Sequence, residues 1–158
     1  MNISSIGQDS HRFVAEGINK PLILGGITID NCNGLDGNSD ADVVLHAVTN
    51  AISGISCINI LGKISDDLCL KDGITDSKVY LQRAIETLGV YKMVHVSISI
   101  EAKRPHLSKH LPEMRKSVGV LLGLDTHHVG ITATTGEGLT AFGKGDGIQA
   151  IVILTVEC

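Results

Sequence analysis

The side chains best suited to metal chemistry are one carboxylate and two imidazoles, from Asp9, His11 and His46. Asp9 and His11 stand two positions apart at the end of a predicted strand, so both side chains should project from the same face. Together with His46 they would form an open zinc site, because three protein ligands leave one tetrahedral position for a substrate. Each residue also fits a plainer role, as a solvated polar group at a strand end or as a buried core histidine.

The segment 35–50 predicts how His46 is positioned, since it reads as a polar loop that runs into a buried helix. Ser39 is the predicted N-cap, with Asp42 three residues later in the position of a capping box. Asp42 and His46 are four residues apart and share one helix face. The helix should continue to about Ile55.

Length and composition favour one globular domain over residues 1–158, with a core of Ile, Val and Leu because only 3% of the residues are aromatic. The net charge of −4 comes from mixed signs without a basic stripe, which argues against nucleic acid or a membrane surface as partner. The four cysteines form no C-x-x-C pair, and neither a signal peptide nor a long apolar span is recognisable. We therefore expect a cytoplasmic protein with reduced thiols.

The remaining pattern predicts an α+β fold, a two-layer sandwich in which helices pack on one face of a mixed β-sheet. The final strand, apolar throughout, should be buried on both faces or face a partner subunit. Residues 56–73 have no clear period and predict a mobile surface loop. The other expected elements are a strand from residue 1 to about 13, a hairpin over 21–30 that turns at Gly25-Gly26, helices over 76–89 and 108–122, and strands over 94–100, 129–133 and 148–156.

A second group of polar residues follows the strand over 129–133. Glu137 stands close to the hydroxyls of Thr134 and Thr135, and a lone carboxylate suits Mg²⁺ or Mn²⁺ bridged by substrate phosphates. A glycine-rich run over 143–147 would let a ligand approach the backbone closely. The Lys/Arg/Pro loop over 101–106 either holds a phosphate or is simply solvated.

Four ordered motifs carry a resemblance to a known family. They are Gly7-Gln8-Asp9-Ser10-His11, the segment 35–46 with its Ser39-Asp40-x-Asp42-x-x-x-His46 centre, Pro112-Glu113-Met114-Arg115, and the segment 132–139 followed by Gly143-Lys144-Gly145-Asp146-Gly147. On these motifs, and over essentially its whole length, the chain resembles the 2-C-methyl-D-erythritol 2,4-cyclodiphosphate synthase family of the non-mevalonate isoprenoid pathway.

The resemblance implies a homotrimer with active sites between subunits, zinc held by Asp9, His11 and His46, and Mg²⁺ or Mn²⁺ held by Glu137 and the substrate diphosphate. The implied reaction is cyclisation of 4-diphosphocytidyl-2-C-methyl-D-erythritol 2-phosphate with release of CMP. Asn38 and Thr135 are the implied catalytic residues, and Lys144 would steady developing charge. The implied substrate-binding residues are Asp9, Ser10, His11, Asn38, Ser39, Ile60, Leu61, Gly62, Asp67, Ala102, Pro105, His106, Leu107, Thr134, Thr135, Gly136, Glu137 and Lys144.

The chain departs from the family pattern mainly where the erythritol part of the substrate would bind. Asn38 replaces a histidine, Ile60-Leu61-Gly62 replaces Asp-x-Gly, and the segment 65–69 replaces Phe-Pro-Asp-x-Asp. Asn50, His106 and Lys144 stand where the family usually has aspartate, lysine and arginine. Three functions stay open on this pattern: an active cyclase with an altered polyol pocket, a non-catalytic trimer that binds zinc and a cytidine nucleotide, and a metal-dependent phosphohydrolase.

Overall fold

A four-stranded mixed sheet forms the centre of the computed structural model, which describes residues 1–158. The strands lie in the order β1 (Asn2–Arg12), β6 (Gly147–Glu157), β4 (Lys92–Glu101) and β5 (Val129–Thr134). β4 and β5 are parallel, whereas β6 is antiparallel to both β1 and β4. The predicted mixed sheet is confirmed, and β1 and β5 are its two edges.

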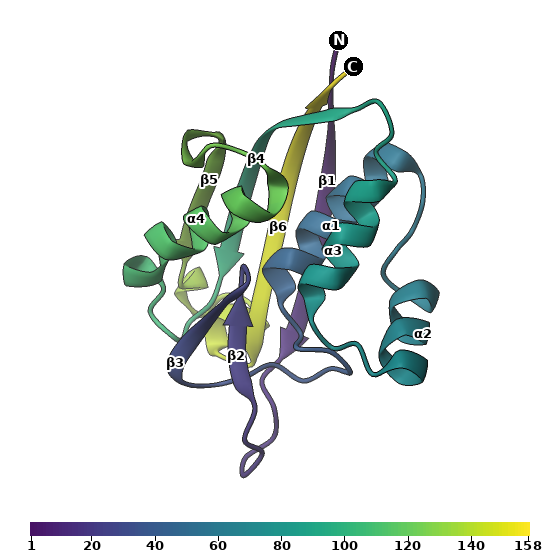
Figure 1. Cartoon of the computed structure of the whole chain (residues 1–158). Helices are drawn as coiled ribbons and strands as arrows, with labels where there is room; N and C mark the ends of the chain where they lie inside the picture. The colour runs from purple at the N-terminus through teal and green to yellow at the C-terminus, as the bar shows by residue number, and fades with distance from the viewer.

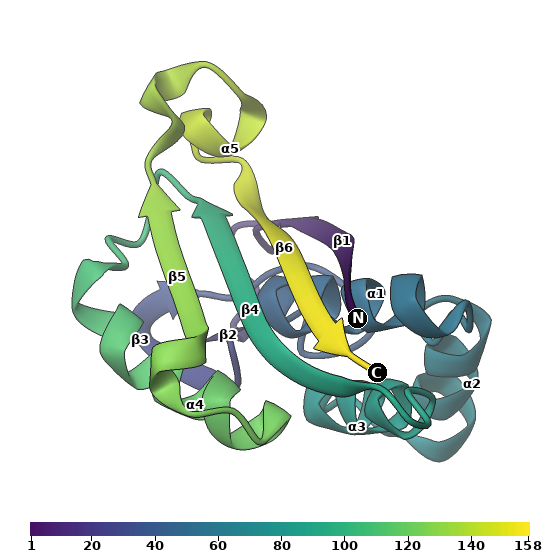
Figure 2. The ribbon, with the colours of Figure 1, turned by 90° about the horizontal axis from the view of Figure 1, so that it is seen from above.

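The helices cover one face of this sheet, as predicted (Figures 1 and 2). The covering layer consists of α1 (Val43–Ser56), α3 (Ser77–Glu86), α4 (Leu111–Leu122) and the hairpin of β2 (Pro21–Leu24) and β3 (Ile27–Asn33). α4 begins later than predicted because a 3-10 turn, Ser108–His110, precedes it. Further 3-10 turns span Thr126–His128 and Gly136–Gly138, and α5 (Ala141–Lys144) lies at the end of the sheet beyond β5. None of the helices combines the length and the apolar character needed to cross a membrane.

Close packing between β1 and α1 depends on Gly7. A Cβ atom at this position would lie 1.9 Å from the carbonyl oxygen of Ala47 and 2.4 Å from the backbone nitrogen of Ala51. Only glycine therefore permits this approach of strand to helix. Because Asp9 and His11 follow on the same face of β1, the same packing brings them toward His46 on α1.

The N-terminus of α1 differs from the prediction, because Asp42 and not Ser39 is the N-cap. The Asp42 carboxylate accepts hydrogen bonds from the backbone nitrogens of Val44 and Leu45. Ser39 Oγ instead accepts from the backbone nitrogen of Ala41, which lies before the helix. Ala41 has a φ of 55°, a left-handed conformation that separates Ser39 from the helix.

The prediction of a loop over residues 56–73 is wrong, since this segment contains α2 (Lys63–Asp72). Its N-terminus is closed by Ser65, whose hydroxyl accepts from the Gly62 backbone nitrogen. Lys63 and Lys71 each pair with Asp67 one helical turn away. Ser65 is the only buried residue of the helix, so no apolar period marks it in the sequence.

Strand β6 carries apolar side chains on both faces, but only one face is buried within the chain. Its even-numbered residues from Ile148 to Val156 belong to the core. On the other face, Ile151 and Ile153 are 39% and 50% exposed, and Ile6 of β1, which pairs with Ile153, is 68% exposed. The sheet therefore presents an apolar patch, formed by these three isoleucines, on the face without helices.

Candidate metal centre and substrate pockets

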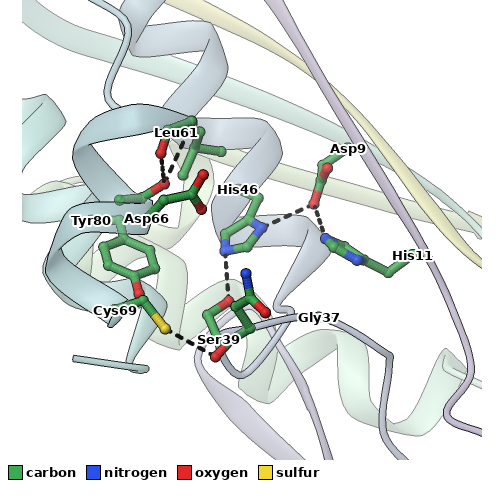
Figure 3. Close-up of a pocket in the computed structure, with 12 residues that line it drawn as sticks. Asp9, His11, Gly37, Ser39, His46, Leu61, Asp66, Cys69 and Tyr80 are labelled. Carbon is green, nitrogen blue, oxygen red and sulfur yellow. Dashed lines mark hydrogen bonds and ion pairs between the residues drawn. The ribbon is translucent and has the colours of Figure 1, made fainter. Parts of the chain in front are cut away.

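The side chains of Asp9, His11 and His46 converge at the end of β1 nearest the start of α1 (Figure 3). Asp9 Oδ2 lies 3.2 Å from His11 Nε2 and 3.0 Å from His46 Nδ1. One potential ligand atom from each residue lies within 4.8 Å of the others. The predicted convergence of this triad is confirmed.

The surroundings of Asp9 keep its carboxylate charged. Burial raises the pKa of Asp9, but the neighbouring imidazoles of His11 and His46 outweigh burial and bring this pKa below 3.8. The hydrogen bond with Asp9 raises the pKa of His11 above 6.5, although burial opposes it. Asp9 is thus a carboxylate at neutral pH, available as an anionic ligand.

The donor set and its spacing fit a divalent cation. Ligand atoms at about 2.0–2.1 Å from a tetrahedral zinc ion are about 3.3 Å apart. The separations of 3.2 and 3.0 Å around Asp9 Oδ2 are close to this spacing. Two imidazole nitrogens and one carboxylate oxygen suit zinc and leave a fourth position open.

The triad lines a pocket of about 330 Å³ between the end of β1, the loop before α1, and α2. Its lining contains seven predicted residues: Asp9, His11, Asn38, Ser39, His46, Leu61 and Gly62. It also contains five residues that sequence reasoning did not identify: Gly37, Ser65, Asp66, Cys69 and Tyr80. Three of these five belong to α2, the helix without a sequence signal, and Tyr80 belongs to the buried side of α3.

A smaller pocket of about 80 Å³ gathers most of the residues predicted to bind the nucleotide. It lies between the loop after β4, the end of β5 and the start of α4. Its lining residues are Ala102, Pro105, His106, Leu107, Ser108, Leu111, Ala133, Thr134 and Thr135. Gly136 and Glu137 follow directly in the 3-10 turn, and Lys144 ends α5. Ser10 lines a separate hollow with Arg12, Phe142 and Asp146.

Comparison with known proteins identifies the family. The family model described as YgbB family matches residues 3–157. The chain belongs to the YgbB family. A curated relative from Chlamydia trachomatis serovar L2b (strain UCH-1/proctitis), named 2-C-methyl-D-erythritol 2,4-cyclodiphosphate synthase, is 50% identical over 152 residues, which cover 96% of this chain and 85% of the relative. The resemblance carried by the sequence motifs is thereby confirmed.

Solved structures agree with the YgbB assignment. A 2C-methyl-D-erythritol-2,4-cyclodiphosphate synthase in a CDP-bound form has a TM-score of 0.80 at 28% identity, covering 98% of this chain and 100% of that one. The bifunctional IspDF from Campylobacter jejuni has a TM-score of 0.87 at 27% identity and covers 99% of this chain. This chain spans 42% of that longer protein.

Two of the residues implied for the segment from Ile60 to Cys69 lie outside the triad pocket. Asp67 points away from the pocket lining, because Lys63 and Lys71 hold its two carboxylate oxygens at 2.9 and 3.1 Å. Ile60 is 4% exposed and belongs to the hydrophobic core. The acidic residue that α2 contributes to the pocket is Asp66.

The loop that contains Asn38 is fixed through its backbone carbonyl groups. Lys20 Nζ donates to the carbonyl oxygens of Gly37 and Ser39 at 3.1 and 2.7 Å. The Cys69 thiol donates to the carbonyl oxygen of Asn38, with 3.0 Å between sulfur and oxygen. Side chains outside the loop therefore hold three successive carbonyl groups, and the Asn38 side chain is not needed to anchor the loop.

The Asp42 carboxylate fixes α1 against the β2–β3 hairpin. Besides capping α1, it accepts hydrogen bonds from the backbone nitrogens of Gly25 and Gly26 at 2.9 and 2.7 Å. Burial raises the pKa of Asp42 from 3.8 to about 6, although the N–H groups of Leu45, Gly26 and Gly25 lower it. His46 lies one turn further along α1, so Asp42 sets the position of a triad residue.

This pKa predicts a pH dependence of folding. Because the folded-state value lies above the unfolded-state value, the stabilisation that protonation of Asp42 contributes is complete below pH 3.8 and is lost as the pH rises through about 6. Asp42→Asn should remove this contribution to the pH dependence of the free energy of unfolding. Urea unfolding of both proteins across this interval measures it, and parallel pH profiles would contradict the assignment.

Proposed function

We propose that the chain is one domain that converts 4-diphosphocytidyl-2-C-methyl-D-erythritol 2-phosphate to 2-C-methyl-D-erythritol 2,4-cyclodiphosphate and CMP, as a phosphorus-oxygen lyase. The observation that carries the proposal is the Asp9–His11–His46 triad, which opens into a pocket of about 330 Å³. The family assignment and the 50% identity to a curated synthase support the same reaction. Of the functions left open, the family match favours the active cyclase.

The reaction needs charge neutralisation and positioning, and no side-chain nucleophile. An oxygen of the substrate 2-phosphate forms a new bond to the β-phosphorus, while the bond from that phosphorus to the bridging oxygen of CMP breaks and its electrons leave with CMP. Asn38 and Thr135 would donate hydrogen bonds as charge develops on phosphate oxygens, and Lys144 would neutralise part of that charge.

Two cation sites are proposed. Asp9, His11 and His46 would hold Zn²⁺, with Asp9 as the anionic ligand. Glu137 would hold Mg²⁺ or Mn²⁺ together with the substrate diphosphate. When bound, the cations would supply Lewis-acid stabilisation of the phosphoryl oxygens.

A homotrimer with the site between subunits accounts for the distribution of these residues. Asp9 and His11 of the triad lie on edge strand β1, whereas Thr135 and Glu137 follow the opposite edge strand β5, about 14 Å away across the sheet. One chain therefore does not bring Glu137 to the triad. Ile6, Ile151 and Ile153 leave an exposed apolar patch that association of subunits would bury.

The proposed location is the cytoplasm, with a small nucleotide as the substrate and neither nucleic acid nor a membrane as partner. All four cysteines are free thiols, and Cys57 and Cys158 are exposed. A reducing compartment keeps such thiols intact. The net charge of −4 offers nucleic acid no general attraction.

A turnover assay tests the proposed function directly. Purified protein, substrate and Mn²⁺ should yield CMP and the cyclic diphosphate in equal amounts, measured by phosphorus NMR. Binding of CDP without turnover would identify a non-catalytic binding protein instead. CMP released with a linear phosphate product would identify a phosphohydrolase.

Glu137→Gln should separate the two cation sites. We expect the variant to need an approximately tenfold higher concentration of Mg²⁺ or Mn²⁺ for half-maximal rate, because the amide lacks the carboxylate charge. Zinc content, measured by elemental analysis, should be unchanged because Glu137 is not part of the triad. An unchanged dependence on Mg²⁺ and Mn²⁺ would remove Glu137 from this role.

Asp66 and Asp67 form a matched pair for testing substrate recognition, since only Asp66 lines the pocket. Asp66→Asn should raise KM, because the variant loses a charged hydrogen bond to a substrate hydroxyl. Such a hydrogen bond contributes about 1.5–3 kcal/mol of binding free energy. Asp67→Asn should leave KM unchanged because its partners are Lys63 and Lys71. The reverse order of effects would show that Asp67 is the substrate ligand and that α2 rearranges.

A further inference from the structure

The two ring nitrogens of His46 have different surroundings. Nδ1 faces Asp9 Oδ2 at 3.0 Å, whereas Nε2 lies 2.8 Å from Ser77 Oγ (Figure 3 shows the Asp9 side). Ser77 is the first residue of α3, is fully buried, and donates its hydroxyl hydrogen to Asp40 Oδ1. The backbone nitrogen of Ser77 donates to the second carboxylate oxygen of Asp40 at 3.1 Å.

The hydrogen bonds of Ser77 determine which ring nitrogen of His46 carries a hydrogen. A carboxylate only accepts, so the single hydroxyl hydrogen of Ser77 is used by Asp40. The Ser77 oxygen must then accept from His46, which places a hydrogen on Nε2. Ser39 Oγ lies 3.5 Å from the same nitrogen and already accepts from a backbone N–H, so it is a weaker partner.

This arrangement leaves Nδ1 of a neutral His46 with a lone pair that points at the Asp9 carboxylate. Two acceptors 3.0 Å apart repel each other unless a cation lies between them. Nδ1 is also the atom that belongs to the triad. The Ser77–Asp40 pair therefore prepares His46 as a metal ligand.

We propose that Ser77 and Asp40 are positioning residues that hold His46 in the tautomer with hydrogen on Nε2 and present Nδ1 to a divalent cation. The proposal rests on the metal site of the proposed function. Asp40 is itself anchored, because its backbone nitrogen donates to the Thr75 carbonyl and its carboxylate accepts from the Asp42 backbone nitrogen. Ser77, at the start of α3, thus supports the metal site through His46 Nε2, although it does not contact the proposed ligand atom Nδ1.

Nitrogen-15 NMR of the unaltered chain tests the tautomer without a variant that could fail to fold. The His46 imidazole signals, assigned by their absence from His46→Gln, should show hydrogen on Nε2 and none on Nδ1 in the zinc-loaded protein. Hydrogen on Nδ1, with Nε2 bound to the metal, would overturn the proposal.

Zinc affinity, measured by competition with a chromophoric chelator, tests the positioning role. Ser77→Ala should weaken zinc binding by about 10–100-fold, and Ser77→Thr, which keeps a hydroxyl, should restore most of it. Thr49→Val is the matched control, because Thr49 is a buried α1 residue whose hydroxyl donates to the Leu45 carbonyl and not to His46. An Ala variant with the affinity of this control would refute the role.

These readouts are separate from catalysis. A chain with the predicted tautomer and a Ser77-dependent zinc affinity but no CMP release would disprove the proposed reaction and support the inference. Normal turnover with a zinc affinity that does not depend on Ser77 would support the proposed reaction and disprove the inference about Ser77.

Discussion

His46→Ala is expected to empty the zinc site and to lower the rate of CMP release by about a thousandfold, the scale found when a preorganised electrostatic contact to the reacting group is lost. His46 supplies one of only three protein ligands, and Asp9 and His11 alone form an incomplete site. Elemental analysis of the purified variant gives the zinc content, and a CMP assay gives the rate.

His95→Ala is the control for this variant. His95 is an exposed histidine of β4 whose ring lies 6.4 Å from that of His128, and it is not part of the triad. Its replacement should change neither zinc content nor rate. One zinc ion per chain in His46→Ala would refute the ligand assignment.

The second large effect is expected on stability. At neutral pH, Asp42→Ala should lower the free energy of unfolding by about 3 kcal/mol, because it removes a helix cap and leaves four backbone N–H groups, three of them in buried hydrogen bonds, without their acceptor. For a chain of this size the midpoint of thermal unfolding should fall by about 10 °C. Urea unfolding measures the free energy directly.

Asp76→Ala is the comparison for Asp42→Ala, since Asp76 caps α3 through one exposed hydrogen bond to the Lys78 backbone nitrogen. Its loss should cost about 1 kcal/mol. Equal effects of the two substitutions would show that the bonds from Asp42 to the hairpin add nothing to stability.

Much of the sheet and the triad could be predicted because local pattern determines them. Alternation along β1 places Asp9 and His11 on one face, and the Gly25-Gly26 pair correctly predicts the hairpin turn. The structure then supplies what local pattern does not, the close contact at Gly7 that brings β1 to α1.

The parts that sequence reasoning missed depend on long-range contacts. α2 is stabilised by surface ion pairs and buries one residue, so its contribution of Asp66 and Cys69 to the pocket had no periodic signal. Ser39 satisfied the rule for an N-cap, but Asp42 serves both the helix and the distant hairpin. Ser77 approaches His46 from 31 residues away.

The substrate residues show the same division. Those on the loops after β4 and β5 gather in one pocket, as the family resemblance implies. The residues of the segment from Ile60 to Cys69 are divided instead. Leu61 and Gly62 line the triad pocket, and Ile60 belongs to the core. Asp66, and not Asp67, is the acidic residue in the pocket lining. In this segment the motif alone does not predict which side chains line the pocket, because the course of the backbone decides this.

Anomalous scattering at the zinc absorption edge, from a crystal of the protein soaked with CDP, tests whether Asp9, His11 and His46 hold a zinc ion that is open to the diphosphate. We expect one strong peak about 2.0–2.2 Å from Asp9 Oδ2, His11 Nε2 and His46 Nδ1, with a diphosphate oxygen as the fourth ligand. An anomalous map without a peak between these three side chains, in zinc-containing crystals that bind CDP, would contradict it.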